Sequence, residues 1–92
     1  MYATVRSYSD SALAGALAGR ADEIRTVISE VPGFRAYYLV EADSGTVSIT
    51  VCDDQAGAEE SNRVAADWLK DNMPELAGAA PAVSAGPVLI DI

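Results

Sequence analysis

Two stretches with helical spacing, residues 11–31 and 54–73, alternate with four strand-like stretches, and this order constrains the fold more than any other feature. In the first stretch Leu13, Leu17 and Ile24 recur at steps of four and seven residues, which places them on one side of a helix. The first stretch also contains two glycines, which weaken a helix interior by about 1 kcal/mol each relative to alanine. We therefore expect two helices, the first of which bends or frays at its beginning.

The strand-like stretches combine β-branched and aromatic residues with alternation of apolar and polar side chains. They cover residues 2–8, 34–40, 46–52 and part of 83–92. A Ser-Gly pair within residues 43–45 predicts a hairpin turn between the second and third strands, and the small residues 77–82 predict a loop. The order β-α-β-β-α-β is typical of the ferredoxin-like α+β fold, a four-stranded antiparallel sheet with two helices on one face.

The third strand has the clearest alternation, because valine and isoleucine occupy one side and small polar residues the other. The apolar side consists of Val47, Ile49 and Val51, and the polar side of Ser48, Thr50 and Cys52. We expect the apolar side to pack under the helices. The opposite face of the sheet would then carry the polar side together with Thr4, Arg6, Tyr8 and one or more of Phe34, Tyr37 and Tyr38. Such a mixed surface suits two sheets packed face to face around a cleft, which predicts a two-fold homodimer.

Length and charge restrict the class of protein. A chain of 92 residues predicts one domain covering residues 1–92. The formal net charge of −8 disfavours nucleic acid and anionic membranes as partners. The single cysteine cannot form an internal disulfide, and no basic region followed by an apolar run begins the sequence, so we expect no signal peptide and a cytoplasmic protein.

Several local motifs occur together in an order that is found in one family. They are Val-Pro-Gly-Phe at residues 31–34, Tyr37-Tyr38, Asp-Ser-Gly-Thr at 43–46, and the helical segment 58–62 leading to Trp68. Over nearly its whole length the chain thereby resembles the antibiotic-biosynthesis-monooxygenase-like (ABM-like) domains of the dimeric α+β barrel superfamily. The resemblance implies a homodimer formed sheet to sheet. In some members it also implies cofactor-free oxidation of a small aromatic, polyketide-like molecule.

The catalytic residues of that family are not matched. Its cofactor-free enzymes carry asparagine and, four residues later, tryptophan on the third strand, where this chain has Ser48 and Cys52. Its haem-degrading members use a histidine as iron ligand, and this sequence contains no histidine. We therefore expect no cofactor and assign no catalytic residue. The function stays open between a protein that binds or oxidises a small aromatic molecule and a non-catalytic dimerisation module without a ligand cavity.

Three residues are the candidate substrate contacts. Arg6 offers a cation that stabilises an enolate or phenolate in a dry site, although an ion pair or a surface position is the more common role of such a residue. Tyr38 offers a phenol, unless both neighbouring tyrosines only pack as strand aromatics. Asn62 would hold a carbonyl if it points inward from the second helix. We expect Cys52 to be inert beside two aspartates, Trp68 to be a packing residue, and no metal site to exist.

Overall fold

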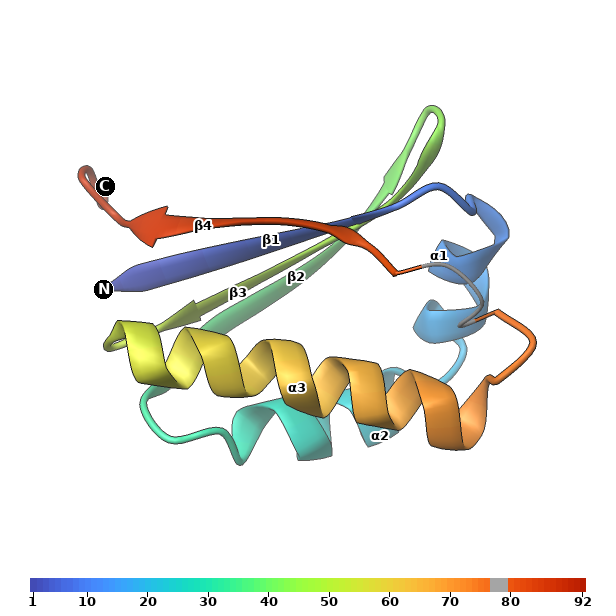
Figure 1. The fold of residues 1–92 in the computed structure, drawn as a ribbon, viewed down its shortest axis with the longest axis horizontal. Coiled ribbons are helices and arrows are strands. Elements are labelled where there is room, and N and C mark those ends of the chain that lie inside the picture. Colours follow the sequence, from blue (N-terminus) through green and yellow to red (C-terminus); the bar gives the residue numbers. More distant parts are fainter. Residues whose placement is uncertain (77–79) are drawn as a thin grey trace.

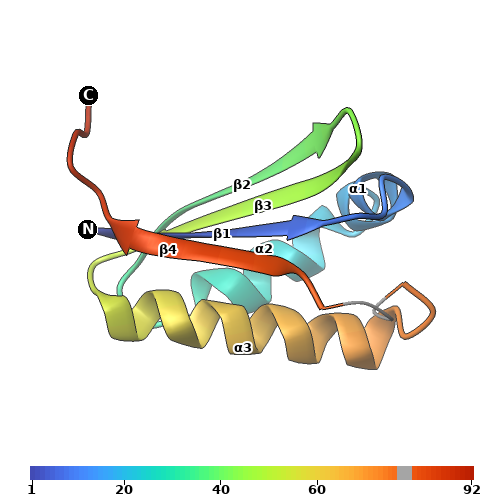
Figure 2. The ribbon, with the colours of Figure 1, turned by 45° about the horizontal axis from the view of Figure 1, so that its top comes forward.

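The computed structural model describes residues 1–76 and 80–92. Four strands form one antiparallel sheet in the order β2-β3-β1-β4, and the helices lie along one side of it (Figures 1 and 2). The strands are β1 (Tyr2–Tyr8), β2 (Phe34–Ala42), β3 (Gly45–Cys52) and β4 (Ala82–Pro87). The predicted ferredoxin-like α+β architecture is therefore confirmed. Of the loop predicted over residues 77–82, residues 77–79 lie outside the described residues, and β4 already begins at Ala82.

The region predicted as one helix, residues 11–31, forms two, α1 (Ala12–Ala18) and α2 (Ala21–Ser29). The break falls at Gly19 and Arg20. Gly19 caps the end of α1, where its N–H donates to the carbonyl of Gly15. Arg20 leaves the helical conformation, with φ −124° and ψ 33°. Glycine is a poor residue for a helix interior, so little is lost when the chain turns here. The prediction of a single continuous helix was wrong, although the glycine at the break is one of those expected to weaken it.

The long helix α3 (Gln55–Asn72) agrees with the prediction to within one residue at each end. Asp54 caps its beginning, because the carboxylate Oδ1 accepts a hydrogen bond from the Gly57 N–H at 3.0 Å. Its end precedes Pro74, whose ring cannot continue a helix. Figures 1 and 2 show α3 running beneath the sheet with α2 beside it, so one face of α3 is available to position side chains under the strands.

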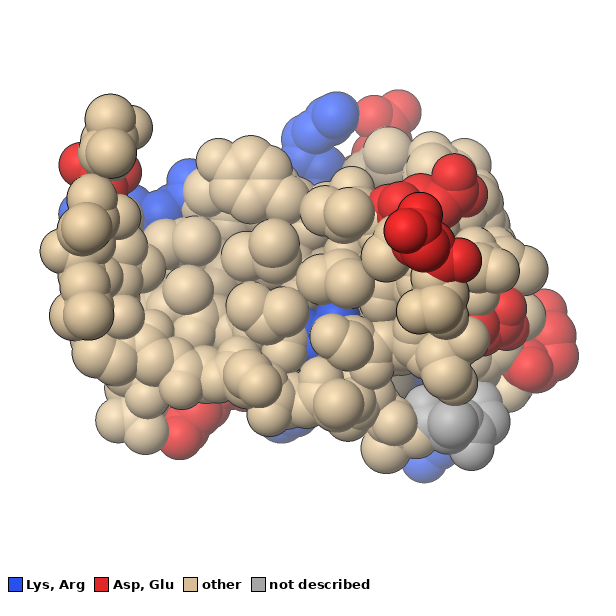
Figure 3. Space-filling model, turned by 90° about the horizontal axis from the view of Figure 1, so that it is seen from above, with Lys and Arg blue, Asp and Glu red and all other residues tan. Residues whose placement is uncertain are grey.

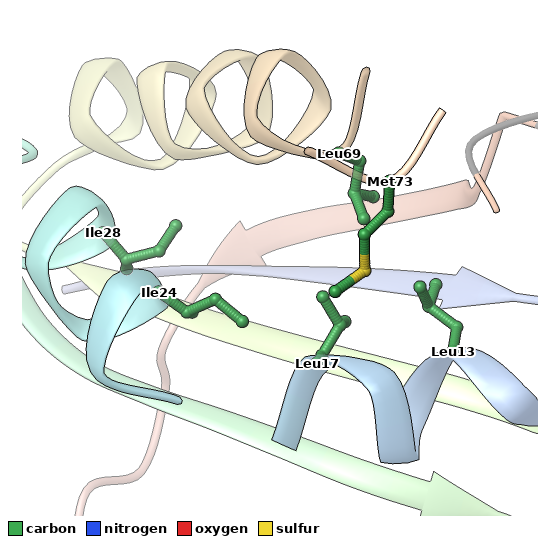
Figure 4. Packing of buried hydrophobic residues seen from close by; sticks show 6 residues of the cluster. All are labelled: Leu13, Leu17, Ile24, Ile28, Leu69 and Met73. Carbon is green, nitrogen blue, oxygen red and sulfur yellow. The ribbon is translucent and has the colours of Figure 1, made fainter. Parts of the chain in front are cut away.

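The apolar core is built mainly from the helices. Six buried side chains from α1, α2 and the C-terminal end of α3 point toward one another (Figure 4): Leu13, Leu17, Ile24, Ile28, Leu69 and Met73. The sheet contributes partly buried larger residues that pack against the cluster, Phe34, Tyr37 and Leu39 from the edge strand β2 and Tyr8 from the end of β1. The centre of the sheet therefore faces the helices with smaller or polar side chains.

The two faces of the sheet are the reverse of those expected from the sequence. The side facing the helices carries residues that are at most 2% exposed: Thr4, Arg6, Thr46, Ser48, Thr50 and Cys52. The apolar residues of β3, Val47, Ile49 and Val51, lie on the opposite side and are only half-buried. The predictions that they pack under the helices, and that the serine, threonine and cysteine side is covered by a second copy, were wrong. The chain's own helices cover that side.

Close packing of α3 explains why small residues occupy the covered side. A Cβ atom added to Gly57, in the first turn of α3, would lie 2.6 Å from the Pro32 carbonyl oxygen and 3.0 Å from the Cys52 Cβ. At this distance the strand has no room for a larger side chain than cysteine. The helices supply most of the apolar core, and the end of β3 beneath the first turn of α3 is restricted to a small side chain.

The open face of the sheet is apolar and free of charge at its paired positions. By register and alternation, the larger residues on it are Val5, Tyr38, Val40, Val47, Ile49 and Val51. Seen from above, this face has few charged side chains across its middle, and most lie toward its rim (Figure 3). Because 22% of the chain is charged, a sheet face without charge at its paired positions is a distinct apolar surface.

Candidate functional site

Buried polar side chains between β1, β3 and α3 form a hydrogen-bonded network centred on Arg6. Its Nη1 donates to Asn62 Oδ1 at 2.7 Å and, more weakly, to Ser61 Oγ at 3.4 Å. Its Nη2 donates to Thr50 Oγ1 at 2.9 Å. Thr4 Oγ1 also donates to Asn62 Oδ1, at 3.0 Å. Asn62 Oδ1 thus accepts two hydrogen bonds from residues more than fifty positions away in the sequence, and it links the helix to the sheet.

The sheet register and the rotation of α3 place these groups together. Thr4 and Arg6 are two residues apart on β1, so they share the face turned toward the helices, and Thr4 pairs with Thr50 of β3. Ser61 and Asn62 lie in the middle of α3. The Ser61 hydroxyl donates to the Ala58 carbonyl at 2.7 Å, which leaves its oxygen lone pairs for Arg6. The network is held by regular secondary structure on both sides, so its geometry is fixed by the fold.

Arg6 is a buried cation without a carboxylate partner among the described residues. Arg6 is 2% exposed. The ion pairs found among residues 1–76 and 80–92 are all formed by other arginines, each of which is more exposed than Arg6. Its Nε has no hydrogen-bond acceptor among the described residues. Removal of a guanidinium from water costs several kcal/mol unless other interactions compensate. Three neutral oxygens offset only part of that cost, so the site holds uncompensated positive charge.

Tyr8 extends this polar group along β1. Burial raises the pKa of the Tyr8 phenol, and the nearby Tyr37 raises it further, while the Arg6 guanidinium opposes the shift. The phenol is consequently neutral around pH 7 and able to donate a hydrogen bond.

A pocket of about 450 Å³ lies between α3 and the β1–β4 side of the sheet and reaches the network. Its apolar lining residues are Ala66, Leu69, Ala80, Pro81 and Val83. The polar side chains on it are Arg6, Tyr8, Asn62 and Lys70. Two of these residues are cations and none is acidic. The pocket therefore combines the apolar walls and the few converging polar groups that are typical of small-molecule sites.

The space between the centre of the sheet and the helices is largely filled. A cavity of about 30 Å³ remains there, lined by Tyr8, Tyr37 and Trp68 among other residues. Trp68 is covered by the Arg20 guanidinium, which lies 5.0 Å from its ring centre. A groove of about 560 Å³ runs beside β2 and the first two helices, but its lining contains only one charged residue, Arg25, which is paired with Asp22 at 2.9 Å. Neither space contains a network comparable to that around Arg6.

The structure brings Arg6 and Asn62 together and places Tyr38 elsewhere. Tyr38 projects from the open face of the sheet and is 58% exposed, while its neighbour Tyr37 faces the helices. The three candidate residues therefore do not form one site within a protomer. Sequence reasoning missed Tyr8 as a member of the site, although the two-residue period of the first strand puts it on the same face as Arg6.

Cys52 is fully buried at the end of β3. Burial raises the pKa of its thiol above the ordinary value, and the carboxylates of Asp54 and Asp53 raise it further, against the opposing effect of Arg6. The protonated thiol is a poor nucleophile, in agreement with the inert role expected from the neighbouring aspartates. Among residues 1–76 and 80–92, no cluster of three or more histidine, cysteine or acidic side chains is placed to hold a metal ion. The same residues include no helix that is long and apolar enough to cross a membrane.

Solved structures share this fold at low sequence identity. Rv0793 from Mycobacterium tuberculosis superposes with a TM-score of 0.68 and 19% identity, over 98% of this chain and 96% of that one. The heme-degrader MhuD (Rv3592) from the same organism, with two hemes bound in its active site, gives 0.71 and 15%, over 100% and 99%. NE2512 of Nitrosomonas europaea, a protein of unknown function, gives 0.70 and 19%, over 99% and 90%. No protein-family profile and no curated protein sequence matches the chain.

These likenesses define the class of fold. The chain has the ferredoxin-like α+β fold of the ABM-like domains, as the sequence motifs implied. More particularly, it has the fold of the protomers of Rv0793 and MhuD over essentially their full length.

The residues of this chain do not fit a haem of the kind that MhuD degrades. The sequence contains no histidine to ligate the iron. The cavity of about 30 Å³ between the centre of the sheet and the helices is far too small for a porphyrin. The likeness to MhuD is therefore one of fold.

Proposed function

We propose that this chain is a cytoplasmic homodimer that binds a small aromatic or polyketide-like molecule in the pocket beside Arg6 and Asn62. The observation that carries the proposal is the pocket of about 450 Å³ that ends at a fully buried, hydrogen-bonded arginine. Its volume lies in the range of about 300–1,000 Å³ that small-molecule sites occupy. A dimerisation module without a ligand would need neither the pocket nor the buried charge, so the observations favour binding.

The apolar open face supports the homodimer. Two such faces packed against each other would remove Val5, Ile49 and Tyr38 from water without burying any charge from the paired positions. A two-fold axis lets the same patch serve both subunits. In this arrangement Tyr38 belongs to the contact between subunits, and the ligand pocket lies on the helix side of each sheet.

The proposal is for binding, and it assigns no turnover. The third-strand positions that correspond to the asparagine and tryptophan of the cofactor-free oxygenases are Ser48 and Cys52, and both face the helices at 2% exposure or less. Neither supplies the amide or indole group of that pair.

Sedimentation tests the dimer. The chain at micromolar concentration is expected to sediment as a dimer, and Ile49→Glu is expected to shift it to a folded monomer, because the carboxylate would be buried without a partner between two sheets. The control Ala12→Glu introduces the same charge at an exposed position at the start of α1 and should remain dimeric. A wild-type monomer would contradict the proposed assembly.

Calorimetric titration tests the ligand pocket. Anthrone, a neutral tricyclic aromatic ketone, is expected to bind with about one molecule per protomer. Ala66→Trp should abolish the heat of binding, because Ala66 lines the pocket from an exposed position on α3 and an indole there would occupy the space. Ala56→Trp, which is also exposed on α3 but lies outside this pocket, is the matched control and should bind normally. Equal binding by both variants would place the ligand elsewhere.

A further inference from the structure

The uncompensated charge of Arg6 identifies a chemical requirement of the ligand. We propose that the molecule bound in the pocket carries an anionic oxygen group, a carboxylate or an ionised enol or phenol, and that Arg6 is the residue that selects it. This inference rests on the proposed binding function and specifies which ligands that site accepts.

The first support is the state of the guanidinium itself. Arg6 is 2% exposed, forms no ion pair with a carboxylate of the described residues, and keeps Nε without an acceptor among them. An arginine side chain stays charged in proteins. Its neighbours Asn62, Ser61 and Thr50 supply only neutral oxygens. An anion in the pocket, which Arg6 lines, would supply the missing negative charge.

The second support is the charge of the pocket against that of the chain. The chain has a net charge of −8, yet the pocket lining contains the two cations Arg6 and Lys70 and no acidic residue. Lys70 is flanked on α3 by two aspartates that lie outside the lining, and one of them, Asp67, is paired with Arg63 at 2.8 Å. A positive pocket in an acidic protein attracts an anion locally while the remaining surface repels it, which favours selection of this particular site.

The third support is the surplus of hydrogen-bond donors. The Oδ1 atom of Asn62 already accepts from Arg6 and Thr4, which fixes the orientation of the amide and leaves its Nδ2 group for a ligand. The Tyr8 phenol is protonated at neutral pH and is a further donor on the pocket lining. Such a lining matches an oxygen group with several lone pairs, and a carboxylate accepts more hydrogen bonds than a ketone does.

The test compares two probes of equal shape that differ in charge. We would titrate the chain with 2-naphthoate and with its neutral analogue 2-naphthamide at pH 7 by calorimetry. The carboxylate is expected to bind about tenfold or more tightly than the amide, in line with the strength of charge-assisted hydrogen bonds. Arg6→Met should abolish this preference. Asn62→Asp keeps the guanidinium and supplies an internal carboxylate at the 2.7 Å contact, so it should abolish the preference as well. Arg25→Met, which changes the charge equally at an exposed position of α2, should retain it.

Each outcome bears on a different part of the inference. Equal affinities of the two probes in the wild-type chain, or a preference for naphthoate that survives both pocket variants, would overturn the assignment of Arg6 while the binding function stands. If naphthoate, naphthamide and anthrone all fail to bind, the proposed binding function is wrong together with this inference. Asn62→Asp gives an independent answer if Arg6→Met does not fold, because it leaves the buried side chain in place.

Discussion

Replacement of Gly45 by alanine is expected to lower the free energy of unfolding by about 3 kcal/mol or more, which is enough to unfold many proteins of this size. A Cβ atom at this position would lie 2.1 Å from the carbonyl oxygen of Tyr8. Gly45 begins β3, directly after the hairpin turn, and the neighbouring Thr46 pairs with Tyr8 in the sheet. The Tyr8 oxygen is a backbone atom, and the position of a Cβ atom is fixed by its own backbone. No side-chain rotation can therefore relieve the contact. The β1–β3 pairing would have to open.

Gly15→Ala is the matched control for this prediction. Nothing lies within 4 Å of a Cβ added to Gly15, and the residue is within α1. Alanine should therefore raise the free energy of unfolding, by about 0.5–1 kcal/mol, through its greater helix propensity. Urea denaturation followed by far-ultraviolet circular dichroism measures both variants. If Gly45→Ala were as stable as the wild type, the close approach of β3 to Tyr8 would be incorrect.

Local signals in the sequence were sufficient for the elements and their order. The first three strands and the long helix α3 were predicted to within about two residues, because alternation, capping by Asp54 and the stop at Pro74 are encoded nearby. The last strand was placed only within residues 83–92, and it covers Ala82–Pro87. The break between α1 and α2 was less accessible. Glycine lowers helix propensity at residue 19, but whether the helix bends or ends there depends on how each half packs against the rest of the protein.

The orientation of the sheet could not be derived from alternation alone. Alternation in β3 shows that its two faces differ, and the more apolar face is ordinarily assigned to the core. In this fold the helices bring leucine, isoleucine and methionine to the core themselves, and α3 packs so closely at Gly57 that β3 must carry a small side chain at Cys52. The valines and isoleucine on the other side are then left for a second layer. In the proposed dimer both faces of the sheet are covered, and the usual assignment of the more apolar face to the core then fails.

A β-bulge in β2 decides which of Tyr37 and Tyr38 faces the helices. The register between β2 and β3 shifts between Phe34 and Ala36, so Phe34 and Tyr37 face the helices although they are three residues apart. A shift of one residue moves every later side chain to the other face of the sheet. Tyr38 is thereby exposed on the open face. Alternation in β1 correctly grouped Arg6 with Thr4 and Tyr8 on one face, but the expectation that this face points away from the helices put Arg6 on the side opposite Asn62.

The buried network makes a second strong prediction for stability. Asn62→Leu is expected to lower the free energy of unfolding by about 3 kcal/mol, because Arg6 Nη1 and Thr4 Oγ1 would both lose the oxygen to which they donate while remaining buried. Asn72→Leu is the matched control. It removes the same side chain from an exposed position of the same helix. There Asn72 accepts from the half-buried Arg20 at 3.2 Å and donates to the Trp68 carbonyl at 2.9 Å, and its loss should lower the stability by no more than about 1 kcal/mol.

A second substitution separates loss of the hydrogen bond from burial of the charge. In the double variant Arg6→Met/Asn62→Leu the guanidinium is absent, so most of the cost of Asn62→Leu should disappear and the stability should return to within about 1 kcal/mol of the wild type. Urea denaturation of both single variants and of the double variant gives the coupling between the two residues. Additive effects would mean that the Arg6 charge is compensated by some other group. Strong coupling would identify Asn62 as the acceptor that allows Arg6 to stay charged between the sheet and α3. If position 6 served only stability, methionine there would be expected to give a more stable protein than arginine.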